Sequence, residues 1–186
     1  MVFVLLELSG CATTPPPKNR SNACSIFHQY PSWYRSAVKA QKRWHAPVNV
    51  TMSIMYYESG FVSDAKPPRE KLLWIIPWKR PSSAYGYCQA TNGTWKSYKR
   101  STSSHFVDRD DFEDAIDFIG WYIDQAHRKL GLCKNDAYNL YLAYHDGIIG
   151  YRRGTYKNKK WLLNLAKKVE RRALIYKEQL KKCCLS

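Results

Sequence analysis

Glu58 is the residue of this chain whose setting best suits acid–base chemistry. It closes an apolar segment, residues 48–57, and is followed by Ser59. Burial at the edge of such a segment disfavours the charged form of a carboxyl group, so the sequence predicts that Glu58 holds its proton near neutral pH. A carboxyl group in that state can protonate the oxygen of a glycosidic bond as the bond breaks. Glu58 is therefore a candidate general acid.

Two further motifs follow the Glu-Ser pair in order along the chain. Residues 86–89 read Gly-Tyr-Cys-Gln with Thr94 shortly after, and residues 143–147 read Ala-Tyr-His-Asp-Gly. Each motif is weak alone, but the ordered series resembles the soluble lytic transglycosylase domain, a lysozyme-like family that cuts peptidoglycan. The family's motifs are Glu-Ser, Gly-Leu-Met-Gln with a nearby Thr, and Ala-Tyr-Asn-Ala-Gly. The resemblance covers roughly residues 45–165.

The resemblance implies a mechanism with a single catalytic carboxyl group. Glu58 would protonate the oxygen that leaves C1 of the muramic acid, and would then take the proton of the 6-hydroxyl as that oxygen closes onto C1. The product would be a 1,6-anhydro sugar, formed without water. By the same resemblance, Ser59, Gln89 and His145 would bind substrate or orient Glu58. Tyr144 would point its hydroxyl at Glu58 or at the reacting sugar.

The chain departs from the family pattern within the motifs and between them. His145 stands where Asn is usual, Asp146 where Ala is usual, and residues 87–88 where Leu-Met is usual. These changes bear on cleft shape and substrate preference rather than on the class of reaction. The segment between the first two motifs is longer than is common, and it contains Trp74, Trp78, Lys79 and Arg80. The Trp residues, with Trp95, either stack on sugar rings or belong to the core. The two cations either meet stem-peptide carboxylates or lie in a solvated loop.

Three alternatives to a transglycosylase remain open, and one of them is a basic protein that binds a membrane surface or nucleic acid. A hydrolytic muramidase would need a second group to activate water, and Asp64 is the nearest other acid in the sequence. A non-catalytic peptidoglycan-binding lipoprotein would keep the fold without using Glu58.

The elements that must position these motifs are predicted to be mainly helical. Apolar residues recur at gaps of three and four over residues 108–130 and 159–182, which predicts two amphipathic helices. Shorter helices are expected after Pro31 and over residues 136–144. Residues 48–58 fit a strand by their alternation and also fit one face of a helix. The resemblance favours the helix, because the family's Glu-Ser pair ends one.

The remaining segments place these helices in one globular domain. Residues 66–81 hold four prolines and are predicted to form a loop with a short strand over residues 72–76. No internal repeat or linker divides residues 21–186, so the sequence predicts a single domain of this mainly α, lysozyme-like α+β class.

The N-terminal residues resemble the lipobox of bacterial lipoproteins. Residues 1–8 are apolar apart from Glu7, and Leu-Ser-Gly precedes Cys11. Lipidation of Cys11 would anchor the protein to a membrane, with residues 1–20 as signal and Pro-rich tether. Ala12 rather than Asp after the cysteine implies the periplasmic face of the outer membrane. No Lys or Arg precedes the apolar run, so we expect the natural chain to start further upstream.

Six cysteines suit an exported protein. If Cys11 carries lipid, a bridge from Cys24 to Cys183 or Cys184 would join the two ends of the domain and stabilise it by about 4–5 kcal/mol in the chain-entropy model. Cys88 and Cys133 either pair or are small buried hydrophobic residues.

The charge balance indicates an anionic partner. Thirty Lys and Arg residues against 15 Asp and Glu residues give a formal charge of +15, which favours nucleic acid, anionic lipid or a cell-wall polymer. The sequence has no zinc-finger spacing, Gly-rich phosphate loop or aromatic ribonucleoprotein motif, so we expect no nucleic acid. Peptidoglycan glycan strands are the expected partner.

The histidines lack metal-ligand spacing, and we expect neither a metal nor a cofactor.

Overall fold

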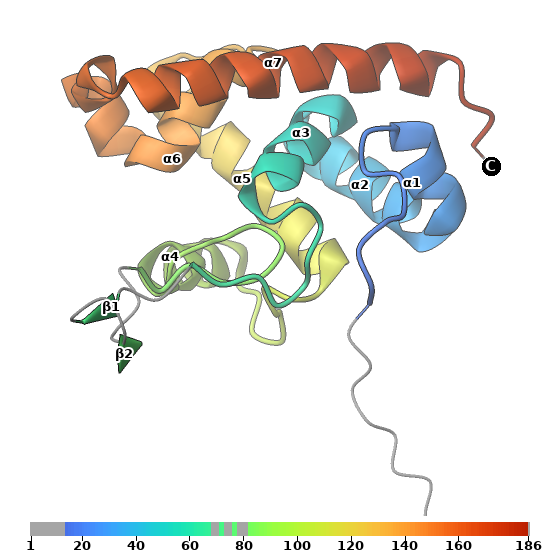
Figure 1. The fold of residues 1–186 in the computed structure, drawn as a ribbon, viewed down its shortest axis with the longest axis horizontal. Helices are drawn as coiled ribbons and strands as arrows, with labels where there is room; N and C mark the ends of the chain where they lie inside the picture. The colour runs from blue at the N-terminus through green and yellow to red at the C-terminus, as the bar shows by residue number, and fades with distance from the viewer. Residues whose placement is uncertain (1–13, 68–70, 73–75, 78–81, 186) are drawn as a thin grey trace, which may run out of the picture.

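The computed structural model describes residues 14–67, 71–72, 76–77 and 82–185 of the 186-residue chain. Within these ranges the chain is mainly helical, as predicted (Figure 1). The elements in chain order are α1 (Ala23–Gln29), α2 (Pro31–Trp44), α3 (Val48–Glu58), β1 (Lys71–Leu72), β2 (Ile76–Pro77), α4 (Asn92–Thr102), α5 (Phe112–Leu130), α6 (Ala137–Arg153), the 3-10 turn η1 (Thr155–Asn158) and α7 (Lys160–Lys181). The predictions for Cys11, Trp74, Trp78, Lys79 and Arg80 lie outside the described residues.

Helix α5 runs through the middle of the domain and packs against α2, α3 and α6. The side chain of Asp111 caps its first turn by accepting from the backbone N–H of Asp114, and the helix ends at Gly131 with φ 72°. Of the six apolar positions predicted for this helix, Leu130 is half-buried and the other five are buried, namely Phe112, Ala115, Ile119, Tyr122 and Ala126. The helix begins at residue 112 rather than 108, because Asp111 has an extended backbone and serves as the cap.

Helix α3 confirms the helical interpretation of residues 48–58 and is the most enclosed element. All of its residues up to Met55 are buried except Asn49, and it packs against α2, α5, α6 and α7. The buried hydroxyls of Thr51 and Ser53 donate to carbonyl oxygens of the preceding turn at 3.0 and 2.8 Å, so neither is left unsatisfied. A helix that is buried all round has no polar face, which is why its sequence pattern did not separate helix from strand.

Helices α6 and α7 form the side of the domain opposite α4 and the β ribbon (Figure 1). Helix α6 was predicted to end near Gly147, and it bends there instead, at φ 77° and ψ 156°, before continuing to Arg153. This backbone conformation is open to glycine and not to residues with a Cβ. Helix α7 matches its prediction, and its buried residues Leu162, Ala166, Val169, Ala173 and Tyr176 lie on the side that packs against α3 and α6.

Two helices near the start and middle of the chain were not predicted. One helix was expected after Pro31, whereas the structure has α1 before it and α2 beginning at Pro31, a position where the missing N–H costs nothing. Helix α4 buries only Trp95 and Tyr98, too few apolar positions to establish a helical period. The side chain of Thr91 caps this helix by accepting from the backbone N–H of Thr94.

The loop between α3 and α4 contains a small antiparallel ribbon. A single strand over residues 72–76 was predicted, but β1 and β2 are two separate strands that pair Lys71 with Pro77 and Leu72 with Ile76. Residues 72 and 76 are paired with each other across the ribbon and do not belong to one strand, so the one-strand prediction was wrong.

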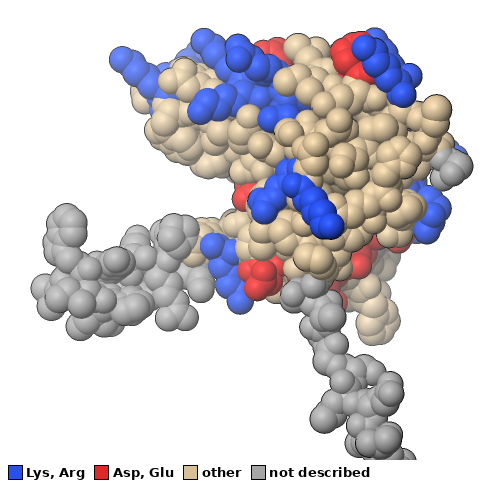
Figure 2. Space-filling model, turned by 45° about the vertical axis from the view of Figure 1, so that its right-hand side comes forward, with Lys and Arg blue, Asp and Glu red and all other residues tan. Residues whose placement is uncertain are grey.

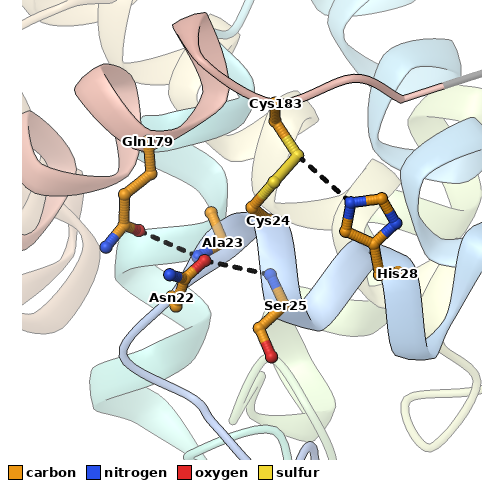
Figure 3. The surroundings of a disulfide bond; sticks show 7 residues. All are labelled: Asn22, Ala23, Cys24, Ser25, His28, Gln179 and Cys183. Atoms are coloured by element: carbon orange, nitrogen blue, oxygen red, sulfur yellow. Dashed lines mark hydrogen bonds between the residues drawn. A yellow bond between two sulfur atoms is a disulfide. The ribbon is translucent and has the colours of Figure 1, made fainter.

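A disulfide between Cys24 and Cys183 ties α1 to the end of α7 (Figure 3). The Cα atoms are 5.7 Å apart and the two residues are separated by 159 positions, as predicted for the first and last parts of the domain. Beside the bridge, Gln179 accepts from the backbone N–H of Ala23 at 2.9 Å. Cys88 is buried and free while Cys133 is exposed and free, so the alternative of a Cys88–Cys133 pair was wrong.

The segment before α1 is in contact with the domain. The Tyr30 hydroxyl donates to the Pro15 carbonyl at 2.8 Å, and Pro17 is buried. The end of the predicted tether is therefore packed against the domain. A Pro-rich segment can lie against an aromatic side chain because proline has no backbone N–H that would need a hydrogen-bond partner.

Candidate active site

Glu58 is the last residue of α3, and its carboxyl group points into a buried environment. Its Oε1 is shielded from solvent and has no hydrogen-bond partner among the described residues. Burial raises the pKa of Glu58 to about 7, because desolvation penalises the carboxylate. The C-terminal end of a helix also carries partial negative charge, which opposes ionisation at this position. The raised pKa expected from the sequence is thus found in the structure.

A cavity of about 540 Å³ surrounds this carboxyl group and gathers all three motifs. The lining residues are Glu58, Pro67, Ser82, Ala84, Gln89, Ala90, Thr91, Thr94, Phe118, Tyr122, Tyr144, His145, Asp146 and Gly147. They come from the end of α3, the loop that follows it, the turn before α4, the start of α4, the middle of α5 and the bend of α6. Residues 86 positions apart in the sequence, Glu58 and Tyr144, therefore share one cavity.

Gln89 is held by the turn that precedes α4. The turn contains Gly86 at φ 77°, where a Cβ would lie 2.1 Å from the Arg109 carbonyl oxygen, so only glycine fits this close approach. The Gln89 Nε2 donates to the carbonyls of Ala65 and Gly86 at 2.9 and 2.8 Å. Because only the nitrogen of the amide can donate to two carbonyls, the orientation of the side chain is defined. Its Oε1 is then the atom that can accept from a bound hydroxyl.

Tyr144 lines the cavity, but its hydroxyl has a different partner from the one predicted. The hydroxyl donates to the Cys88 carbonyl at 2.5 Å, which joins α6 to the second motif. The proton of this hydroxyl is therefore directed at the backbone of the turn, and the expectation that the hydroxyl also meets Glu58 or the sugar stays a prediction. Tyr144 acts as a brace between two walls of the cavity.

Tyr141 is the tyrosine that contacts Glu58, and sequence reasoning missed it. Interaction with the Tyr141 hydroxyl lowers the pKa of Glu58 against the larger effect of burial. Tyr141 itself is buried, and its own pKa is raised by burial and by the charge of Glu58. It stands three residues before Tyr144, on the same face of α6, so helical spacing was the signal that could have identified it.

The end of α3, the turn before α4 and the bend of α6 bring the three motifs together in one cavity. The family model of the transglycosylase SLT domain matches residues 1–183 of the chain. The chain belongs to the transglycosylase SLT domain family. No curated protein matches it. The family implies transglycosylase-type activity on peptidoglycan.

Ser59, the second residue of the first SLT motif, does not line the cavity. Its Oγ accepts from the backbone N–H of Phe61 at 3.2 Å, and Gly60 and Phe61 both have positive φ, 59° and 62°. The hydroxyl therefore closes the tight turn that follows α3. The expected substrate contact is not supported by this position, and Ser59 fixes the end of the helix that carries Glu58.

His145 and Asp146 occupy the positions where this SLT member departs from the family pattern, and both line the cavity. The His145 ring lies 5.0 Å from the Trp161 ring in an edge-on contact. Partial burial and the nearby Lys159 charge lower the pKa of His145, so the ring is neutral at neutral pH. A neutral ring presents one donor and one acceptor to a ligand.

Asp146 is the second carboxyl group of the cavity, and its side chain is only 3% exposed. It pairs with Lys159 and accepts a hydrogen bond from Thr155. Burial alone would raise the pKa of Asp146, but these two partners bring it below its ordinary value. Asp146 is therefore ionised, and its carboxylate is held by Lys159 and Thr155. Asp64, the acid considered from the sequence, is exposed and absent from the cavity lining.

Trp95 and Thr94 show how the start of α4 contributes to the cleft. Thr94 lines the cavity, as the second SLT motif requires. Trp95 is buried and lies 5.1 and 5.3 Å from the rings of Tyr98 and Phe118. Of the two roles considered for Trp95, the structure therefore supports a core residue.

Proposed function

We propose that this chain is a peptidoglycan lytic transglycosylase that cleaves the β-1,4 bond between N-acetylmuramic acid and N-acetylglucosamine and leaves 1,6-anhydro ends. The observation that carries the proposal is the contrast between the two cavity carboxyl groups. Burial places the pKa of Glu58 at about 7, whereas Asp146 is kept ionised by Lys159 and Thr155. One group can exchange a proton near neutral pH, and the other is committed to a structural ion pair.

A pKa near 7 suits a residue that must act first as an acid and then as a base. In the first step the Glu58 proton passes to the glycosidic oxygen, the C1–O bond breaks, and positive charge develops on the sugar ring. In the second step the 6-hydroxyl oxygen bonds to C1 and its proton returns to Glu58. The residue ends the cycle in the form in which it began, and no water is consumed. The Tyr141 hydroxyl, which lowers the pKa of this carboxyl group, would stabilise the carboxylate between the two steps.

The surroundings of Glu58 favour this route over hydrolysis. A hydrolytic muramidase that uses a second carboxylate as base would need that carboxylate free to accept a proton from water. Asp146 is already paired with Lys159, and Asp64 lies outside the cavity lining. The sugar's own 6-hydroxyl is then the nucleophile that requires no further catalytic group.

We further propose that the enzyme works as a lipoprotein anchored through Cys11 on the periplasmic face of the outer membrane. The support is the lipobox-like sequence of residues 8–11 and the presence of a disulfide joining Cys24 to Cys183, since such bonds persist in oxidising compartments. None of the helices in the described part of the chain is long and apolar enough to cross a bilayer.

Digestion of purified peptidoglycan tests the catalytic part of the proposal. The wild-type chain is expected to release soluble muropeptides, and Glu58→Gln is expected to release fewer by a factor of at least about 1,000, because the acid is lost. Asp64→Asn is the matched control and is expected to retain activity. If wild-type and Glu58→Gln proteins bind peptidoglycan equally and neither releases product, the chain is a non-catalytic binding protein and the proposal is wrong.

A further inference from the structure

The outer face of α7 carries two exposed apolar side chains between two groups of cations. Leu174 and Ile175 are 58% and 39% exposed. They are preceded by the exposed residues Lys167, Lys168 and Arg171 and followed by the exposed residues Lys181 and Lys182. We call these seven residues the α7 outer face.

These cations are available to a partner. Helix α7 has seven Lys and Arg residues against two acidic residues, Glu170 and Glu178. Of the cations on the α7 outer face, only Lys181 forms an ion pair within the described chain, with Glu178 at 2.7 Å. Figure 2 shows Lys and Arg side chains gathered along this edge of the molecule. The other four cations of the α7 outer face have no ion pair within the described chain, and such a group of like charges creates a local positive potential that attracts an anionic surface.

The opposite side of the same helix is occupied by the domain. Its buried residues, among them Val169, Ala173 and Tyr176, pack in the core against α3 and α6. Leu174 and Ile175 follow directly after Ala173, and at 100° per residue they turn away from that core. Figure 1 places α7 along one edge of the molecule, with α4 at the other. A flat partner could therefore contact α7 without touching α4.

The apolar pair distinguishes a lipid surface from a soluble anionic polymer. A polyanion would satisfy the cations but would leave Leu174 and Ile175 in water. A bilayer interface satisfies both, because anionic headgroups attract Lys and Arg while apolar side chains enter the boundary of the acyl chains. We propose that the α7 outer face docks flat on an anionic lipid bilayer. This second contact would orient the domain on a membrane, and it stands independently of the chemistry of Glu58.

Vesicle sedimentation with the full-length Cys11→Ser chain, which cannot be lipidated, tests the proposal. We expect salt-sensitive binding to vesicles of phosphatidylglycerol and phosphatidylcholine and none to phosphatidylcholine alone. The triple variant Lys167→Gln, Lys168→Gln, Arg171→Gln should bind about 100-fold more weakly, since each cation near an anionic surface contributes about a factor of five. Arg35→Gln, Lys42→Gln and Lys96→Gln, which remove three exposed cations from α2 and α4, form the matched control and should bind as the parent.

The double variant Leu174→Ser, Ile175→Ser separates lipid insertion from charge attraction. It should bind the same vesicles about 10-fold more weakly, and helical circular dichroism should confirm that it is folded. Vesicle binding that is unchanged in the triple or the double variant would overturn the proposal. So would loss of binding to purified peptidoglycan with vesicle binding intact, since the face would then be a polymer site. Digestion of soluble peptidoglycan fragments should be unaffected by either variant, so failure here is distinct from failure of the proposed enzyme activity.

Discussion

The Tyr141 hydroxyl on α6 lies close enough to the Glu58 carboxyl group at the end of α3 to lower the pKa of that group. This contact opposes the burial of Glu58, whose Oε1 has no partner among the described residues. The balance between the two effects places the pKa of Glu58 at about 7. In the proposed reaction this interaction would favour the ionised form of Glu58 that exists between the two proton transfers.

Tyr141→Phe is expected to raise the pKa of Glu58, since it removes the contact that lowers it. The acid must be protonated to begin the reaction, so the alkaline limb of the kcat/KM profile should move to higher pH. The maximal rate should fall, because the carboxylate formed in the first step loses its donor. A pH profile measured on peptidoglycan fragments checks this. Equal loss of activity at every pH, with the limb unmoved, would mean that Tyr141 has only a packing role.

Glu58 is also expected to make the domain less stable as the pH rises. Its folded pKa of about 7 lies above the ordinary value of 4.5, so the native state binds more protons than the unfolded state within that window. Stability should therefore fall between about pH 4.5 and pH 7, by up to about 3 kcal/mol. Urea unfolding at pH 5 and pH 8 checks the sign. Glu58→Gln should remove this pH dependence, and a wild-type chain whose pH dependence equals that of Glu58→Gln would contradict it.

The Tyr144 hydroxyl is expected to contribute mainly to stability. Tyr144→Phe would leave the Cys88 carbonyl without the donor that lies 2.5 Å from it, which should cost about 1–2 kcal/mol in urea unfolding. The control is Tyr34→Phe, because the Tyr34 hydroxyl makes no hydrogen bond to another described side chain or backbone group. A variant of unchanged stability that had lost its catalytic rate would instead support the direct role expected from the sequence.

Asp146 is expected to hold the wall of the cavity rather than to act on water. Asp146→Asn would break its ion pair with Lys159 and should lower stability by about 1–3 kcal/mol, since a nearly buried partner is lost. The product should keep its 1,6-anhydro end. Analysis of the muropeptides by mass spectrometry checks this, and a variant that had lost product formation while remaining folded would assign Asp146 a chemical step.

The helices that could be predicted from the sequence are those with a repeating apolar face. Helices α5 and α7 have such a face, whereas α4 buries only Trp95 and Tyr98 and was missed. Helix α3 is buried on all sides, so the spacing of its apolar residues did not distinguish a helix from a strand. The resemblance was needed to identify it as a helix. The disulfide was anticipated because Cys24 and Cys183 lie at the two ends of the domain.

The cavity could be predicted as a set of motifs but not as a set of contacts. Glu58, Gln89, Tyr144 and His145 do line one cavity. Which tyrosine reaches Glu58 depends on the rotation of α6 against α3. Which carboxyl group is held ionised in an ion pair depends on Lys159, 13 residues beyond Asp146. Both are set by tertiary packing, and neither spacing follows from the chain order alone.

Digestion of peptidoglycan in water enriched in heavy oxygen tests the central claim most directly. Each cut made by a transglycosylase should yield a 1,6-anhydro-muramic acid end that contains no heavy oxygen, because the 6-hydroxyl supplies the new bond to C1. Glu58→Gln should yield no such ends above background. Reducing ends that carry the heavy oxygen, formed by the wild-type chain and lost in Glu58→Gln, would identify a hydrolase and would contradict the proposed reaction.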